Sequence, residues 1–237
     1  MNRFVAKAVD WMLLSALILL LSLGTYQRNG LWNSEMKLWK DCGRKAPHKE
    51  RVHHNLGFVY YELGQWDEAR KEFEEALRLT PDYALSLYNL GLVYYQKGLM
   101  REAIHRYKKA IELDPTFSNS YYNLGLAYYH LGRYRKAIKA YEELLRLRPD
   151  HENAYSRLGL TYQKLREPEK AIQSFQEELR YHPKNVYAHI YLGEIYLETK
   201  EYPKALAHFK KALKEPNLPD AESIRKVISC LERAPKR

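Results

Sequence analysis

The sequence of 237 residues lacks the groupings of residues that catalysis and metal binding usually need. Its two cysteines, Cys42 and Cys230, lie far apart and match no metal-binding or redox spacing, so they indicate neither a disulfide framework nor a compartment. The nine histidines form no HExxH pair and no Cys/His cluster, and no P-loop, GxGxxG or GxSxG motif occurs. Paired glutamates at 74–75, 142–143 and 177–178 are typical of solvated helix faces. We therefore predict no enzyme activity, no catalytic residue, no metal site and no cofactor.

Acidic residues are too few to balance the basic ones, and the formal net charge is +10. The excess is uneven, because residues 50–219 hold 26 basic and 23 acidic residues, whereas residues 28–49 hold six basic and two acidic ones. The body of the chain therefore lacks a basic stripe that could follow nucleic-acid phosphates, and we expect no nucleic-acid partner. The basic excess at 28–49 suits contact with anionic lipid instead.

No charged residue occurs between Trp11 and Gln27, and this run, WMLLSALILLLSLGTYQ, predicts a membrane helix. A helix of this length spans about 25 Å, slightly less than a hydrocarbon core of about 30 Å, and the apolar residues before it can extend it. The predicted membrane contact is residues 4–27, within an anchor at 1–29. A cleaved signal peptide is the alternative, but no small-x-small cleavage site follows Leu23.

The orientation of this single-pass anchor has two conflicting indications. Arg3 and Lys7 lie on a very short N-terminal tail and favour an N-terminus inside the cell. The basic residues at 28–49 follow the span and favour the cytoplasm for the rest of the chain. The short tail leads us to expect an extracytoplasmic C-terminal part.

From Glu50 onward the sequence repeats every 34 residues, in six columns that stay in register. The columns hold leucine (Leu56, Leu90, Leu124, Leu158, Leu192), glycine (Gly57, Gly91, Gly125, Gly159, Gly193), tyrosine (Tyr60, Tyr94, Tyr128, Tyr162, Tyr196), alanine (Ala69, Ala103, Ala137, Ala171, Ala205), an aromatic residue (Phe73, Tyr107, Tyr141, Phe175, Phe209) and proline (Pro81, Pro115, Pro149, Pro183). Each block predicts two helices joined by a turn, at Gly132 in the third block. The glycine of the first helix costs up to ~1 kcal/mol of helix propensity. Its recurrence therefore needs a packing reason, namely close approach of the second helix, with the alanine column expected to face it.

This pattern closely resembles that of the tetratricopeptide repeat (TPR) family, and the resemblance covers residues 50–219. It implies an all-α, right-handed α-solenoid of five antiparallel helix pairs, whose first helices line a concave groove. The five repeats are predicted at 50–83, 84–117, 118–151, 152–185 and 186–219. The fourth repeat departs from the pattern, because Arg166-Glu167-Pro168 replaces the glycine turn and Glu178 stands where three other repeats have alanine. We expect looser packing there.

Two flanking segments complete the predicted solenoid. Residues 30–49 fit the second half of a repeat, with Trp39 on the aromatic column and Cys42 on the small-residue column, which predicts a buried thiol. Residues 220–237 predict a capping helix followed by a basic tail, because Ile224, Val227, Ile228 and Leu231 form an apolar stripe.

A second resemblance covers the junction between the anchor and the repeats. Residues 25–47, TYQRNGLWNSEMKLWKDCGRKAP, are similar to the link between the last membrane helix and the repeats in bacterial-type multi-pass membrane proteins with C-terminal TPR tails. Some of those proteins resemble membrane glycosyltransferases or protein O-mannosyltransferases. The catalytic multi-pass portion has no counterpart in this sequence.

The candidate binding residues lie on the first helices, where helical geometry and the TPR resemblance place them on the concave wall. They are Asn55, Asn89, Asn123, Tyr61, Tyr95, Tyr129, Tyr88, Tyr122 and Arg157, which replaces the asparagine in the fourth repeat. A row of asparagines can hold an extended peptide backbone, since each amide both donates and accepts. A similar row does so in the TPR enzyme that attaches N-acetylglucosamine to serine and threonine. The asparagines can also serve only the scaffold, by bonding a neighbouring helix or water.

These observations predict a non-enzymatic, membrane-anchored scaffold or adaptor whose groove binds an extended peptide or loop of a partner protein. The alternative is an accessory or detached TPR tail of a membrane protein-glycosylation system. Binding of a chaperone's acidic C-terminal tail is not expected. In the TPR domains that bind such tails, basic and amide residues are needed where His54, Phe58 and Asn119 stand in this chain.

Overall fold

The computed structural model describes residues 34–216, 218–219 and 221–233, and every regular element within these ranges is a helix. The all-α prediction is therefore confirmed for this part of the chain. The predicted anchor at 1–29 lies outside the described residues. Among the residues that are described, no helix has both the length and the apolar character needed to cross a membrane. The chain divides into two compact units, Met1–Leu113 and Asp114–Arg237.

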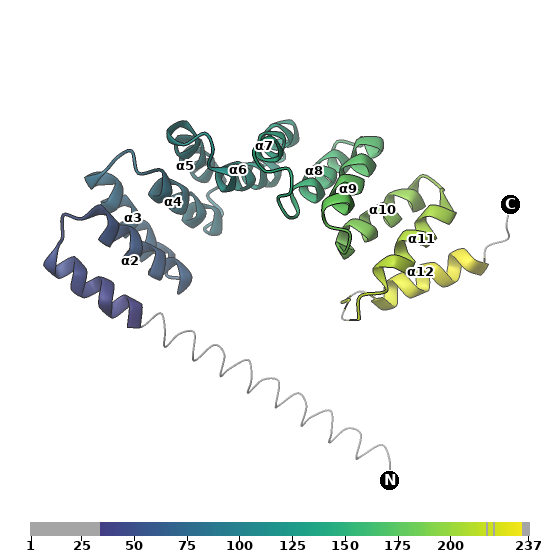
Figure 1. Ribbon diagram of the computed structural model, residues 1–237, viewed down its shortest axis with the longest axis horizontal. Coiled ribbons are helices and arrows are strands. Elements are labelled where there is room, and N and C mark those ends of the chain that lie inside the picture. The colour runs from purple at the N-terminus through teal and green to yellow at the C-terminus, as the bar shows by residue number, and fades with distance from the viewer. Residues whose placement is uncertain (1–33, 217, 220, 234–237) are drawn as a thin grey trace, which may run out of the picture. The chain divides into compact units, whose positions relative to one another are not determined.

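The first unit contains a helix at residues 34–45 followed by two helix pairs (Figure 1). The pairs are α2 (Glu50–Glu62) with α3 (Trp66–Leu79), and α4 (Ala84–Gln96) with α5 (Met100–Leu113). Helix α3 also packs against α4, so the second helix of one pair joins the first helix of the next. Ala69 and Phe73 of α3 and Leu90 and Val93 of α4 form a shared buried cluster. Stacking thus gives each amphipathic helix a neighbour that buries its apolar stripe.

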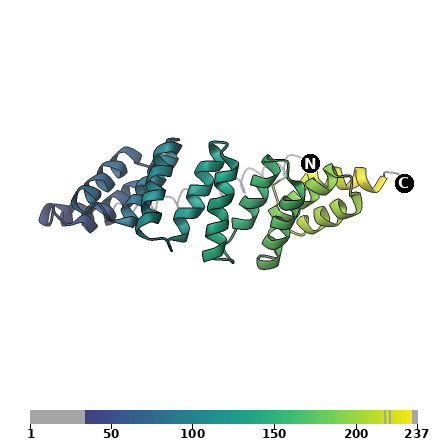
Figure 2. The same ribbon diagram turned by 90° about the horizontal axis from the view of Figure 1, so that it is seen from above.

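The second unit continues the same alternation of first and second helices (Figure 2). Its elements are α6 (Ser118–His130), α7 (Tyr134–Leu147), α8 (Ala154–Lys164), α9 (Pro168–Tyr181), α10 (Val186–Glu198), α11 (Tyr202–Ala212) and α12 (Ala221–Arg233). Each of these helices packs against the next one in the chain. Helix α12 packs against α11, and its Ile224 and Ile228 are buried in the core cluster that also contains Phe175 and Phe209.

The glycine column of the first helices lies against the aromatic column of the second helices. A Cβ built on Gly125 would lie 2.4 Å from Cε1 of Tyr141, and one on Gly91 would lie 2.5 Å from Cε1 of Tyr107. In all five repeats the nearest atoms belong to the aromatic ring. The aromatic column, rather than the alanine column, therefore supplies the atoms nearest to the glycines. The ring lies so close to the first helix that a methyl group at the glycine position would collide with it.

The turn between the two helices of a pair keeps one backbone conformation with or without glycine. Gly64, Gly98 and Gly132 have φ angles of 72°, 75° and 68°, in the left-handed region. Arg166 in the fourth repeat and Lys200 in the fifth have φ angles of 59° and 62°. The fourth repeat thus keeps the turn geometry although arginine replaces glycine, and the positive φ angle strains the backbone at Arg166.

Replacing Arg166 by glycine is expected to raise the free energy of unfolding of the second unit by about 1 kcal/mol, because glycine adopts positive φ without strain. Urea unfolding followed by far-UV circular dichroism measures the change. Arg166→Ala is the matched control, since it removes the side chain and keeps the Cβ that causes the strain. Equal stabilisation by both variants would contradict the backbone explanation.

The fourth repeat encloses its unusual glutamate. Glu178 is fully buried. Its carboxylate accepts hydrogen bonds from the backbone N–H of Asn153 (3.2 Å) and Ser156 (3.0 Å), and from Nδ2 of Asn185 (3.0 Å). These donors lie at the starts of α8 and α10, where backbone N–H groups have no partner within the helix. The buried carboxylate thus has hydrogen-bond partners at the starts of two helices, and looser packing of this repeat remains a prediction.

Cys42 is more exposed than the repeat pattern predicts. Its side chain is only partly buried, so the prediction of a buried thiol was wrong. The helix at residues 34–45 is the first described element of the stack and contacts α2 near Gly43, where a built Cβ would lie 3.7 Å from Cγ1 of Val52. No preceding described helix covers its remaining surface.

Candidate functional site

The predicted binding residues fall on both units, and the structure groups them within each unit. Helices α2 and α4 of the first unit carry Asn55, Tyr61, Tyr88, Asn89 and Tyr95. Helices α6 and α8 of the second unit carry Tyr122, Asn123, Tyr129 and Arg157. We call the side of these first helices that carries these residues the first-helix face of each unit.

In the first unit the predicted tyrosines surround the buried Tyr107 of α5. Burial raises the pKa of Tyr107, and the hydroxyls of Tyr88, Tyr61 and Tyr95 shift it in the same direction. The Tyr88 ring lies 6.0 Å from the Tyr107 ring, centroid to centroid. Nε2 of Gln96 donates to the Tyr61 hydroxyl (3.4 Å), which links the ends of α4 and α2. Three of the predicted residues therefore form one aromatic cluster.

The three asparagines do not present equivalent amides. Asn89 is buried, with 6% of its surface exposed, whereas Asn55 and Asn123 are half-buried. Nδ2 of Asn123 donates to the backbone carbonyl of Asn119 (3.1 Å), one turn earlier in the same helix. The burial of Asn89 favours a scaffold role for that residue. The exposed portions of Asn55 and Asn123 leave room for contact with a ligand.

In the second unit Arg157 is the centre of the predicted set. Its side chain is exposed, and it lies near Tyr122 of α6 and Tyr191 of α10. Loss of hydration opposes its charge, but a hydrogen bond to the Tyr122 hydroxyl and the nearby Tyr141 and Tyr191 outweigh that effect and raise the pKa of Arg157. Among the described residues, no carboxylate forms an ion pair with it. The guanidinium therefore keeps its charge among tyrosine rings, a setting suited to recognising a ligand acceptor.

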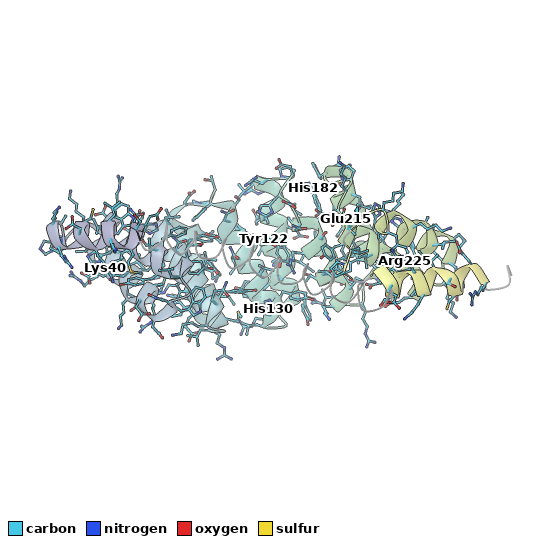
Figure 3. All side chains as sticks on the ribbon, turned by 90° about the horizontal axis from the view of Figure 1, so that it is seen from below. Lys40, Tyr122, His130, His182, Glu215 and Arg225 are labelled. Atoms are coloured by element: carbon cyan, nitrogen blue, oxygen red, sulfur yellow. The ribbon has the colours of Figure 1, made fainter. Side chains whose placement is uncertain are left out.

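Several predicted tyrosines also pack against the scaffold. The Tyr61 ring lies 5.1 Å from the Trp66 ring, and Tyr129 lies 5.5 Å from Tyr134, at the same position two repeats later. The Tyr122 ring stacks on His151 at 5.0 Å with an interplanar angle of 27°. Figure 3 labels Tyr122 and His130, which belong to opposite halves of α6. These rings are held in place by neighbours, so a ligand would meet pre-ordered aromatic surface.

Sequence reasoning missed exposed apolar residues on the first helices. Phe58 of α2, Leu85 of α4 and Tyr187 of α10 are 38%, 41% and 56% exposed. Tyr191, which lies beside Arg157, was also missed as a binding residue. The composition of α4 and α10 could have indicated such residues. Both helices are apolar around most of their circumference, more than is needed to pack against second helices.

His54 of α2 belongs to the core of the first unit. It is 6% exposed, and its Nδ1 lies 2.8 Å from the Ser86 hydroxyl of α4. Its ring packs against Tyr83 (5.0 Å) and Phe73 (5.6 Å). Burial lowers the pKa of His54 to about 4. The imidazole is therefore neutral near pH 7 and joins α2 to α4.

This burial predicts acid sensitivity of the first unit. Because the pKa of His54 is about 4 when folded and near 6.5 when unfolded, the unfolded state binds a proton first as pH falls. The contribution of His54 to the free energy of unfolding should therefore decrease below pH 6.5, by about 1 kcal/mol at pH 5.5, and the decrease should end near pH 4. Tryptophan fluorescence during urea unfolding reports on this unit, because Trp66 lies within it and all four tryptophans precede residue 67.

His54→Gln is expected to remove most of that pH dependence. The matched control is His105→Gln, which changes an exposed histidine on α5 of the same unit. A loss of pH dependence in the control equal to that of His54→Gln would contradict the assignment.

The stacked helix pairs and the first-helix face define a helical repeat protein of the helix–turn–helix type. Models of the tetratricopeptide repeat match residues 49–116, 116–184 and 156–222. The chain belongs to the tetratricopeptide repeat family. This confirms the family predicted from the repeat columns. A comparison with curated protein sequences gave no match.

Solved structures share the fold. MamA is 28% identical with a TM-score of 0.65, and the match covers 73% of this chain and 97% of that one. TTC0263 from Thermus thermophilus is 26% identical with a TM-score of 0.55, over 77% and 98% of the two chains. YrrB, described as a TPR protein with an unusual peptide-binding site, is 20% identical with a TM-score of 0.66, over 79% and 97%. At that identity the likeness to YrrB shows the fold alone.

Proposed function

We propose that this chain is a protein-binding adaptor that holds an extended segment of a partner protein on its first-helix faces. The observation that carries the proposal is the exposure of apolar and aromatic side chains on helices whose other sides are packed, at Phe58, Leu85 and Tyr187. Exposed apolar surface of this kind marks interaction sites when polar groups border it.

Polar groups supply the orientation that such binding needs. Arg157 has no described carboxylate partner and lies beside the tyrosines at 122 and 191, and Asn55 and Asn123 are partly exposed. Backbone amides and carbonyls of an extended segment fit amide and hydroxyl side chains that both donate and accept. A peptide-binding site is described for YrrB, which has the same fold, and transfer of that property to this chain is our proposal.

Site-specific crosslinking tests the proposal. A photo-crosslinking amino acid is placed at Tyr95 or at Tyr129 in the full chain within cells, so that one position is tested in each unit. We expect both positions to capture the same partner protein, and Arg157→Ala to reduce capture from position 129. Matched controls place the crosslinker at Lys108 and Lys139, exposed residues of the second helices α5 and α7. Equal capture from the control positions, or none from Tyr95 and Tyr129, would refute binding on these faces.

We further propose that residues 4–27 attach the adaptor to a membrane, because this part of the sequence is a long apolar run. Retention of the full chain in the membrane fraction after alkaline carbonate extraction, and its loss when residues 1–27 are deleted, would support the anchor. The role as a tail of a protein-glycosylation system rests on the resemblance of residues 25–47, and co-purification with a multi-pass enzyme is its test.

A further inference from the structure

A cleft of about 570 Å³ opens in the second unit between the α9–α10 connection and the end of α11. Its lining residues are Leu179, Pro183, Lys184, Val186, His189, Lys211, Lys214 and Glu215. Its volume falls in the range of about 300–1,000 Å³ typical of ligand sites. His189 and Tyr191 are two residues apart on α10, so their side chains point about 200° apart. The cleft therefore lies on the opposite side of α10 from the first-helix face around Arg157.

The lining of the cleft carries more positive than negative charge. Lys184, Lys211 and Lys214 line it, and among the described residues no carboxylate lies within ion-pair distance of any of the three. Other lysines of α11 are paired, since Lys204 contacts Glu201 (2.5 Å) and Lys210 contacts Glu232 (2.7 Å). Glu215 is the single acidic residue in the lining. Unpaired ammonium groups around one concavity attract an anionic ligand.

One residue of the lining, His189, belongs to a neutral pair of histidines. Nδ1 of His189 and Nδ1 of His208 are 3.0 Å apart, so one ring donates and the other accepts. Burial, His208 and Lys211 lower the pKa of His189 to about 4, and burial and Lys211 also lower the pKa of His208. The Tyr196 ring stacks on His208 at 5.6 Å. The pair is uncharged near pH 7, so the positive charge of the cleft comes from its lysines.

Part of the cleft lining is apolar. Leu179, Pro183 and Val186 line it, and Leu179 and Val186 also pack against the buried core of the second unit. The lining includes no arginine and no glycine-rich backbone loop of the kind that cradles a phosphate group. Dispersed ammonium groups together with apolar side chains favour a ligand that carries several separated carboxylates and an apolar side chain.

We propose that this cleft binds a short acidic peptide segment, with glutamate or aspartate side chains paired to Lys184, Lys211 and Lys214 and an apolar side chain against Leu179 and Val186. The site is separate from the first-helix faces and does not depend on the proposed function. A chain with both sites would hold two segments of a partner, or two partners, on opposite sides of α10.

Fluorescence anisotropy of a labelled, terminally blocked peptide Glu-Glu-Leu-Glu-Glu tests the proposal with the full chain. We expect saturable binding that weakens at least tenfold in the triple variant Lys184→Gln, Lys211→Gln, Lys214→Gln. The matched triple variant Arg133→Gln, Arg135→Gln, Lys139→Gln removes the same charge from exposed positions of the second unit, and should bind within twofold of the unmodified chain. Far-UV circular dichroism confirms that both variants are folded.

Two further probes define the ligand. The peptides Gln-Gln-Leu-Gln-Gln and Glu-Glu-Gly-Glu-Glu should both bind at least fivefold more weakly, because each lacks one of the two features that the cleft recognises. The proposal would be overturned by a lack of saturable binding or by equal weakening in the matched variant. It would also be overturned if the glycine peptide bound with equal affinity, or if inorganic phosphate at the concentration of the peptide displaced it. The crosslinking positions Tyr95 and Tyr129 lie outside this cleft, so the two proposals fail independently.

Discussion

Replacing Glu178 by alanine is expected to lower the free energy of unfolding of the second unit by about 3 kcal/mol. The change removes three hydrogen bonds and leaves the backbone N–H groups of Asn153 and Ser156 and the side-chain amide of Asn185 without this buried acceptor. Three other repeats have alanine at this position, Ala76, Ala110 and Ala212. Alanine is therefore compatible with this position of the repeat. The decrease in the free energy of unfolding then measures how far the start of α8 depends on the carboxylate.

The measurement combines two probes of urea unfolding. Far-UV circular dichroism follows helix loss in both units, whereas tryptophan fluorescence follows only the first unit, since no tryptophan lies beyond Trp66. Amide hydrogen exchange at Ser156 gives a local reading, and its protection should fall in the variant. The control is Glu177→Ala, which removes a surface partner of Arg180 (2.7 Å) and should change stability little. A Glu178→Ala variant as stable as this control would show that the buried carboxylate is dispensable.

Replacing Gly125 by alanine is expected to lower the free energy of unfolding of the second unit by about 2 kcal/mol. Alanine improves helix propensity by up to ~1 kcal/mol, but the new methyl group would lie 2.4 Å from a carbon of the fully buried Tyr141 ring. Overpacking of a closed core costs about 1–3 kcal/mol, and more when the neighbour cannot move aside. The steric cost should therefore outweigh the gain in propensity.

A second substitution separates the two effects. In the double variant Gly125→Ala, Tyr141→Leu the smaller side chain leaves room for the methyl group, so the alanine should then be neutral or stabilising relative to Tyr141→Leu alone. Urea unfolding of the four chains gives the coupling energy, expected to be about 2 kcal/mol. Gly57→Ala, with a closest distance of 2.9 Å to Phe73, should cost less than Gly125→Ala. A coupling energy near zero would contradict contact with the ring as the cause.

The first-helix face was predictable only in part. Periodicity placed Tyr122, Arg157 and the asparagines on one side of their helices, because 34-residue spacing and helical geometry together determine which positions share a face. It could not show that Asn89 is buried while Asn55 remains half-exposed, since burial depends on how closely the neighbouring helices pack. It also could not show that Tyr191 joins Arg157, because that contact links α8 to α10.

Repeat length, the two-helix unit, the all-α class and the family could all be predicted from the sequence, because each rests on residues that recur at a fixed spacing. The way in which departures from the pattern are accommodated could be seen only in the folded chain. Arg166 keeps the turn of glycine, Glu178 fills an alanine position by bonding two helix starts, and three unpaired lysines meet around one cleft. The physical reason is that these outcomes depend on contacts between helices, and a linear pattern specifies which residues recur without specifying which neighbours they meet.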